Sequence, residues 1–362
     1  GETWTLVGNA SIFQPPVDES GPFGYLAEKA STNLAIQSED FTTSWSINEV
    51  TLTANAAVAP DGTTTMDRLA VTTANSPHRI YQYQAGVSVS AGTNYTSSVY
   101  MKDDGAGFGG VVFWVIGHAV SVVVDLSTGL VTHTRTTNNG VLVASGCDDV
   151  GNGVYRVWVS GNSTTAGAMY PMVFASNAAV PAAWNDGVPS YTGVLGEDIL
   201  IWGAQAELGT YPTSYIPTTT TAVTRNADVL IAGDMVTDAA GSGYAEASSI
   251  WANSPSLAYL ISRNSTGRLL YAGSEPATFI KAYDGTNVPE SPKAISFQGR
   301  PAPMASTWGN NLTVYKDGVG GTSTAYDGTM GTGNLGIGNE NGGSSQWNGT
   351  VREVKIFDSE LT

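Results

Sequence analysis

The sequence has few of the residues that disulfide-linked, metal-bound or membrane-spanning proteins need. Cys147 is the only cysteine in 362 residues, so an intrachain disulfide and a cysteine-based zinc or redox site are excluded. His78, His118 and His133 lie far apart and match neither zincin nor catalytic-triad spacing. No apolar run reaches membrane-spanning length, and we therefore expect no membrane insertion.

Charged residues are also scarce, and their signs are unbalanced. They make up 13% of the chain and leave a net charge of −16. An acidic surface repels the phosphate backbone, so we expect no nucleic-acid partner. The simpler explanation of the acidic charge is that it keeps the protein soluble.

Helical periodicity is missing, and strand patterns take its place. The nearest helix candidate, 177–184, is short and contains Pro181. The 43 glycines and the many short apolar runs instead predict strands joined by tight turns. Residues 155–159 alternate cleanly, and Gly-Asn-Gly at 151–153 suits the positive φ angles of a turn. We predict an all-β protein.

The length allows two domains, each with its own core. We predict an irregular lead-in at 1–30, a jelly-roll β-sandwich at 31–208, an extended connector at 209–230 and a second β-sandwich at 231–362. The strands expected in the second sandwich are Leu257–Ser262, 269–272, 293–298, 312–316, 335–338 and 351–357, with turns at Asp317-Gly318 and Asn348-Gly349.

One expected strand, 111–116, is apolar on both of its faces. Such a strand lies centrally, covered by the opposing sheet on one side and by a loop or a partner chain on the other. We assign Trp45, Trp114 and Trp202 to core or interface positions.

Several motifs of the first sandwich occur in an order that resembles a known family. The segment WGAQAEL at 202–208 ends the first β-rich block, and SYIP at 214–217 and AVTRNADV at 222–229 follow it. Upstream lie three shorter stretches, at 32–45, 59–64 and 150–156. Together they resemble the jelly-roll, carbohydrate-binding-like module of bacteriophage tail-fibre and tail-spike proteins. In that family the motifs serve folding, so they indicate kinship and no binding site.

The second sandwich is similar to laminin-G and concanavalin-A-like domains, on the segments 312–318, 335–338 and 347–357. Such domains bind glycans, bind proteins, hydrolyse glycans or only pack, so the fold does not choose among these functions. The combined resemblance implies an extracellular virion-tail protein, a parallel homotrimer, that attaches to bacterial surface polysaccharide. Burial in a trimer interface and burial in a monomer core both explain why the strand at 111–116 is apolar on both faces.

Sugar recognition requires flat aromatic faces beside side chains that bond to hydroxyl groups. The loop 181–191 offers Trp184, Asn185, Asp186 and Tyr191, and Tyr170 is a further candidate. A second group is expected around a hairpin tip in the second sandwich, and its members are Trp308, Asn310, Tyr283 and Trp347. The alternative for both groups is that the aromatic rings only cover the ends of the sandwiches.

Catalysis has less support, and we assign no catalytic residue. The Glu-x-Asp-x-x-Glu spacing of sandwich glycosidases is absent. A carboxylate pair from separate strands stays open, and with it a capsule depolymerase or glycanase. A structural spacer of the virion without a ligand is the third alternative.

We expect no cofactor apart from a candidate structural calcium ion. The adjacent pairs Asp103-Asp104 and Asp148-Asp149 lie in expected turns. Calcium takes six to eight oxygen ligands, more than two adjacent carboxylates supply.

Overall fold

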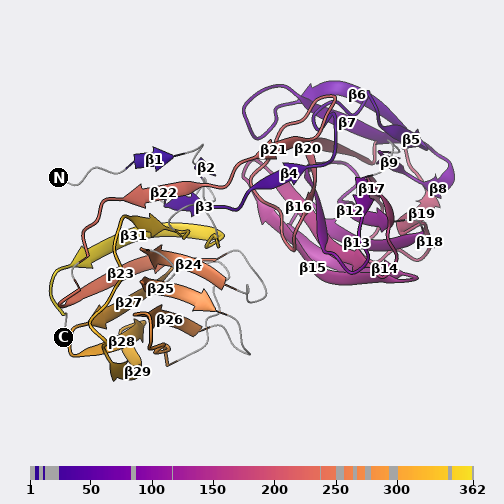
Figure 1. Cartoon of the computed structure of the whole chain (residues 1–362). Coiled ribbons are helices and arrows are strands. Elements are labelled where there is room, and N and C mark those ends of the chain that lie inside the picture. Colours follow the sequence, from indigo (N-terminus) through magenta and orange to yellow (C-terminus); the bar gives the residue numbers. More distant parts are fainter. Residues whose placement is uncertain are drawn as a thin grey trace. The chain divides into compact units, whose positions relative to one another are not determined.

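The computed structural model describes residues 5–7, 11–12, 24–82, 87–115, 117–236, 238–249, 257–263, 267–273, 279–292, 301–340 and 345–360. These residues form antiparallel β-sheets and contain no α-helix, which confirms the all-β prediction (Figure 1). No helix among them is long and apolar enough to span a membrane. The chain divides into a central domain, Ser31–Arg225, and a terminal domain built from Gly1–Pro15, Ser20–Ala30 and Asn226–Thr362.

The central domain is a sandwich of two sheets. Sheet 1 has the order β14-β13-β12-β17-β9-β5, with β10 also paired to β17. Its strands are β5 (Ser46–Asn48), β9 (Arg79–Tyr81), β10 (Val87–Val89), β12 (Phe108–Val115), β13 (His118–Asp125), β14 (Leu130–Thr137) and β17 (Gly167–Ser176).

Sheet 2 has the order β15-β16-β11-β20-β7-β6. Its strands are β6 (Val50–Ala57), β7 (Met66–Val71), β11 (Tyr95–Asp104), β15 (Gly140–Asp149), β16 (Val154–Ser163) and β20 (Asp198–Leu208). Two small sheets complete the domain, β18-β19-β8 and β21-β4. They consist of β4 (Ser31–Asn33), β8 (Asn75–Pro77), β18 (Trp184–Asn185), β19 (Val188–Thr192) and β21 (Val223–Arg225).

The main core lies between sheets 1 and 2. In β16 it takes up Val157 and Val159, and Tyr155 packs against it from the same face, as the alternation predicts. The turn before this strand has the predicted positive φ angles, 88° at Gly151, 56° at Asn152 and 71° at Gly153.

Strand β12 lies in the interior of sheet 1; residues 111–113 and 115 are buried, whereas Trp114 is partly exposed, and residue 116 lies outside the described residues. Phe113 faces the main core, whereas Val112 belongs to a second apolar cluster on the outer face. Gly187, in the turn of the β18–β19 hairpin, lies against Val112, so a loop of the chain itself covers the strand. The central position of the strand is confirmed, and the loop covers its outer face at Val112 while Trp114 stays partly exposed.

The WGAQAEL segment forms a buried polar seam. Glu207 is fully buried, and its carboxylate accepts hydrogen bonds from Ser31 Oγ (2.5 Å), Gln205 Nε2 (2.6 Å) and the Thr213 backbone N–H (2.8 Å). Asn33 donates to the Ala204 carbonyl at 3.0 Å. These bonds tie the first strand of the domain to β20, so this part of the motif serves folding.

The terminal domain is a second sandwich, with sheet 3 in the order β1-β22-β30-β24-β25-β26 and sheet 4 in the order β2-β3-β31-β23-β27-β28-β29. The strands of sheet 3 are β1 (Thr5–Val7), β22 (Val229–Ala232), β24 (Leu257–Ser262), β25 (Arg268–Gly273), β26 (Phe279–Tyr283) and β30 (Leu335–Ile337). Those of sheet 4 are β2 (Ser11–Ile12), β3 (Tyr25–Ala27), β23 (Gly241–Ala247), β27 (Ala302–Trp308), β28 (Asn311–Lys316), β29 (Val319–Ala325) and β31 (Gly349–Phe357). The predicted strand 293–298 lies outside the described residues.

Two predicted segments need correction. The lead-in 1–30 is not irregular throughout, because β1 pairs with β22 and β3 pairs with β31 in the terminal domain. The connector 209–230 is anchored as well as exposed: Ile216 is buried and its N–H donates to Gln205 Oε1, whereas residues 219–224 are exposed and β21 pairs with β4. Strands of three residues that pair with the far end of the chain are too short to show the alternation that reveals longer strands.

Candidate functional site

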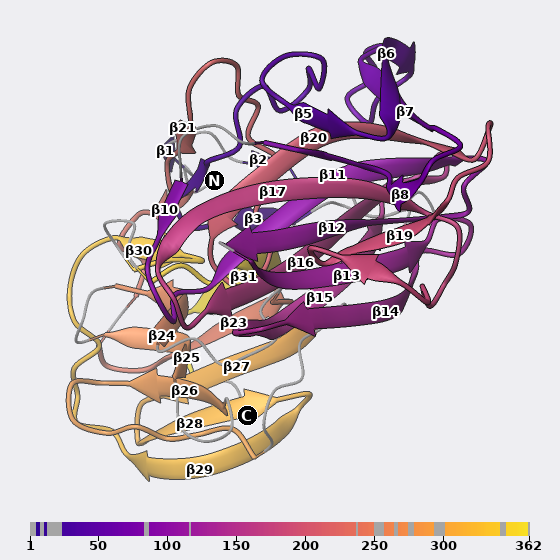
Figure 2. The ribbon, with the colours of Figure 1, turned by 90° about the vertical axis from the view of Figure 1, so that its right-hand side faces the viewer.

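The outer face of sheet 1 carries a group of partly buried aromatic side chains. Trp114 of β12 lies directly opposite Tyr170 of β17, and their ring centroids are 5.0 Å apart at an interplanar angle of 51°. Tyr81, on the neighbouring β9, belongs to the same cluster. Figure 2 shows β12 and β17 side by side in this sheet. We call Tyr81, Trp114 and Tyr170 the aromatic face.

A basic and an acidic side chain border the aromatic face. The Arg79 guanidinium lies 5.3 Å from the centroid of the Tyr81 ring and 3.4 Å from the Asp186 carboxylate. The Arg79 side chain is 13% exposed and that of Asp186 50% exposed. The buried Nε1–H of Trp114 and Nε–H of Arg79 have no acceptor among the described residues. The face therefore combines flat apolar rings with a partly exposed ion pair at its border.

The β18–β19 hairpin positions Asp186 beside this face. Its two turn residues have positive φ angles, 52° at Asp186 and 77° at Gly187, which is the backbone of a tight type I′ turn. Ser121 Oγ donates to the Gly187 carbonyl at 2.5 Å and anchors the turn to β13. A side chain at residue 187 would collide with Ala119, so glycine is required here for space as well as for conformation.

Trp184 packs on the edge of the sheet. Its ring centroid is 5.6 Å from that of His133, and the Arg135 guanidinium lies 5.1 Å from it. Its Nε1–H donates to the Pro181 carbonyl at 2.9 Å. Trp184 is thus partly buried, with its indole N–H already used, and its main role is to hold the hairpin on the sheet.

The structure brings some of the predicted residues of the central domain together. Tyr170 forms part of the aromatic face, and Asn185 and Asp186 are exposed at the hairpin tip. Tyr191 does not join them, because its ring packs on His78 with centroids 4.7 Å apart. Burial raises the pKa of its hydroxyl, and this hydroxyl has no partner among the described residues.

The predicted group in the terminal domain does not assemble. The proposal that Trp308 and Trp347 expose their rings is wrong, since both are fully buried. Trp308 pairs with Gly241 at the start of β23, whereas the indole N–H of Trp347 donates to the Ser248 carbonyl just beyond its end. Both rings are packed in the interior of the terminal domain, as core side chains are.

The remaining two members of that group occupy turns. Asn310 is exposed between β27 and β28, and the Tyr283 hydroxyl donates to the Gly285 carbonyl at 2.6 Å. The Arg268 guanidinium lies 5.0 Å from the Tyr283 ring centroid. Neither residue extends the aromatic face, which belongs to the other domain.

Sequence reasoning missed Trp114, Tyr81 and Arg79. Trp45 and Trp202 are core residues, as assigned, but Trp114 lies partly exposed on the outer face. The signal was present in the alternation of β12, where Trp114 falls on the face opposite Phe113. The pairing of β12 with β17 brings Trp114 opposite Tyr170, and no sequence spacing shows that register.

The acidic pairs proposed for calcium are used by the protein itself. Asp103 Oδ1 accepts from the Gly105 and Gly107 N–H groups, and Asp104 forms an ion pair with Arg68 at 2.5 Å. Asp148 accepts from the indole N–H of Trp158 at 3.1 Å. Among the described residues no group of three or more His, Cys, Asp and Glu side chains is placed to hold a metal ion.

Comparisons with known proteins add only distant structural likenesses. No protein-family model matches the sequence, and no curated protein matches it. A candidate carbohydrate-binding protein from Bacteroides ovatus ATCC 8483 aligns with a TM-score of 0.30 and 11% identity over 76% of this chain and 79% of that one. Domains LG4-5 of the mouse laminin α1 chain align with a TM-score of 0.25 and 8% identity over 90% of this chain and 91% of theirs.

Proposed function

We propose that this chain is a carbohydrate-binding protein whose ligand lies on the aromatic face of the central domain. The observation that carries the proposal is the Trp114–Tyr170 pair, two partly exposed rings with centroids 5.0 Å apart on a rigid sheet. Strands hold side chains more firmly than loops do, so the rings are pre-positioned. The apolar side of a pyranose ring packs on such rings.

The polar neighbours supply the second half of sugar recognition. Arg79 offers several N–H donors and Asp186 offers carboxylate oxygens, and the two lie 3.4 Å apart. Sugar hydroxyl groups both donate and accept hydrogen bonds, so a mixed donor and acceptor pair suits them. Asn185 is exposed next to Asp186 and adds an amide.

The finer proposal is that the ligand is a bacterial surface polysaccharide and the chain part of a bacteriophage tail fibre, outside the cell. It is supported by the ordered motifs from Thr32 to Val229. The same resemblance is the basis for proposing a parallel homotrimer. Strand β12 adds nothing to that argument, because the β18–β19 hairpin of the same chain covers its outer face at Val112 and Trp114 lies on the proposed ligand surface.

The direct test is glycan-array screening of the full chain, followed by calorimetric titration of the best ligand. We expect Trp114→Ala and Tyr170→Ala each to weaken binding by roughly tenfold, because each removes about 1.4 kcal/mol of stacking and burial. Leu195→Ala changes a residue that is 74% exposed in a loop and should leave the affinity unchanged. Equal affinities for all four proteins would overturn the proposal. Release of reducing ends from the bound polysaccharide would instead indicate a glycanase.

A further inference from the structure

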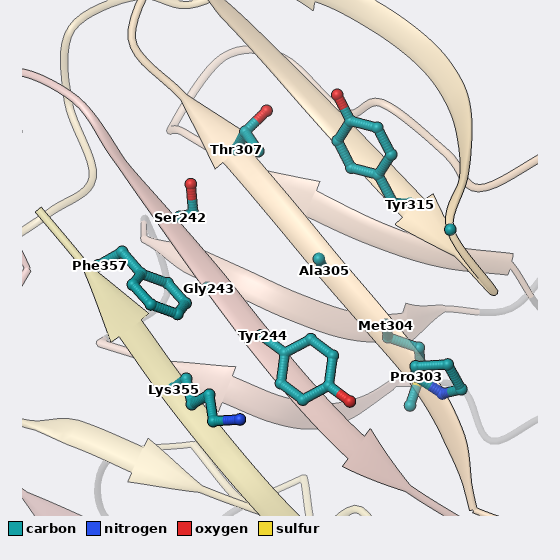
Figure 3. A pocket seen from close by; sticks show the side chains of 11 residues that line it. Ser242, Gly243, Tyr244, Pro303, Met304, Ala305, Thr307, Tyr315, Lys355 and Phe357 are labelled. Carbon is teal, nitrogen blue, oxygen red and sulfur yellow. The ribbon is translucent and has the colours of Figure 1, made fainter. Parts of the chain in front are cut away.

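A groove on the outer face of sheet 4, in the terminal domain, has a volume of about 510 Å³. Figure 3 shows that Tyr244, Tyr315 and Phe357 stand up from three strands around it, with the small Ala305 between the two tyrosines. All three aromatic side chains are partly buried. None of them was proposed from the sequence as a ligand contact; Tyr315 and Phe357 entered only as parts of the segments 312–318 and 347–357.

The side chains of the groove form rows across the strands. Tyr244 of β23 pairs with Ala305 of β27, which pairs with Tyr315 of β28. Two strand spacings separate the tyrosines, about 10 Å between their backbones. The parallel row holds Phe357, Ser242 and Thr307. The aromatic side chains therefore border a surface of small and hydroxyl-bearing residues.

Lys355 is the charged residue among those that line the groove, and the charged side chains near it on β23 and β31 form ion pairs. Lys355 Nζ lies 2.7 Å from Glu353 and 5.5 Å from the centroid of the Tyr244 ring. Arg352 forms an ion pair with Glu246 at 3.4 Å. Two cations and two anions leave no excess charge to attract an ionic ligand, and the net charge of −16 repels acidic chains.

One polar group in the groove is unused. The Thr307 hydroxyl is buried and has no hydrogen-bond partner among the described residues. A buried hydroxyl without a hydrogen bond raises the free energy of the folded protein. A ligand hydroxyl that reached it would supply the missing partner. The groove thus presents aromatic surface above a buried hydroxyl that lacks a partner among the described residues.

We infer that this groove binds a neutral, linear glycan that runs across the strands, with one sugar ring on Tyr244 and another on Tyr315. The tyrosine spacing of about 10 Å suits alternate rings of an extended chain. A volume of about 510 Å³ lies within the range of small-ligand clefts. The inference is independent of the proposed function, since the two sites belong to different domains.

Titration of the full chain with cellohexaose, laminarihexaose, isomaltohexaose and mannohexaose tests the inference. At least one of these neutral probes should bind, and Tyr244→Ala and Tyr315→Ala should each lower its affinity roughly tenfold. Tyr244→Phe and Tyr315→Phe keep the rings and should stay within about twofold. The matching disaccharide should bind at least tenfold more weakly than the hexasaccharide, because it cannot span both rings.

Titrations in a Trp114→Ala background separate the two sites, because that chain lacks a ring of the aromatic face; there the losses caused by Tyr244→Ala and Tyr315→Ala should be the same as in the parent chain. Leu195→Ala changes an exposed loop residue and is the neutral control for both sites. The inference is overturned if no neutral hexasaccharide binds, if the tyrosine-to-alanine variants bind like the parent chain, or if a galacturonate hexamer binds more tightly. It is also overturned if the tyrosines instead control self-association, seen as a mass that falls in Tyr244→Ala by analytical ultracentrifugation.

Discussion

At the scale of residues, neighbouring positions of β12 differ in their burial and therefore in their role. Phe113 is fully buried in the main core, whereas Trp114 lies partly exposed beside Tyr170. The 180° alternation of a strand produces this division. A change at Trp114 therefore affects a surface, while a change at Phe113 creates a cavity in the core.

Cys147 gives a prediction at the same scale. It lies in β15, partly buried against the main core, and burial with the nearby charges of Asp148 and Asp149 raises the pKa of its thiol to about 12. The thiolate is the reactive form, so at pH 8 almost no reactive species is present. We expect Ellman's reagent to label the native chain far more slowly than the urea-unfolded chain. Equal rates would show that the thiol is accessible and ionisable in the fold.

Single residues also mark the limit of sequence reasoning. Trp308 precedes Gly309 and Asn310, which is typical of an exposed hairpin tip, yet it is fully buried. The sequence shows the turn but not that the Trp308 ring lies against Gly241, far away along the chain. Exposure of an aromatic ring is a tertiary property, and only the packing of distant segments decides it.

At the scale of elements, the β18–β19 hairpin connects folding to the proposed site. Gly187 has φ of +77°, and an added Cβ would lie 2.4 Å from Ala119 Cβ. We expect Gly187→Ala to lower the free energy of unfolding by about 2–3 kcal/mol and to weaken glycan binding, because Asp186 moves with the turn.

Gly196→Ala is a matched control, because Gly196 also has positive φ, +90°, but nothing lies within 4 Å of its Cβ position. It should cost only the backbone strain, about 1 kcal/mol, and spare binding. Equal losses for the two variants in urea titrations would contradict the tight docking of the hairpin.

The long strands were predictable, and the short ones were not. The alternation at 155–159 and the doubly apolar run at 111–115 identify β16 and β12 correctly, and Asp317-Gly318 forms the predicted turn with φ of 52° and 74°. Strand β3 has three residues and pairs with β31 at the other end of the chain. No local pattern encodes such a partner.

At the scale of the whole molecule, the polar seam makes the start and the end of the central domain one cooperative unit. Glu207 accepts hydrogen bonds from Ser31, Gln205 and Thr213 while fully buried. We expect Glu207→Ala to destabilise the central domain by about 3 kcal/mol, because several buried donors lose their acceptor.

Glu207→Gln keeps the side-chain shape and one acceptor oxygen, and the hydroxyls of Ser31 and Thr213 can accept from the new amide. It should therefore cost less than Glu207→Ala in urea unfolding followed by tryptophan fluorescence. If the two variants were equally stable, the hydrogen bonds of the seam would not be what holds the domain together.

The measurement that tests the account most directly is the affinity of the full chain and of Trp114→Ala for the best array glycan, with Trp114→Phe beside them. The account predicts that the alanine variant loses roughly tenfold in affinity while the phenylalanine variant keeps most of it, since an aromatic ring still covers the site. Undiminished binding by Trp114→Ala would contradict a carbohydrate site on the outer face of sheet 1.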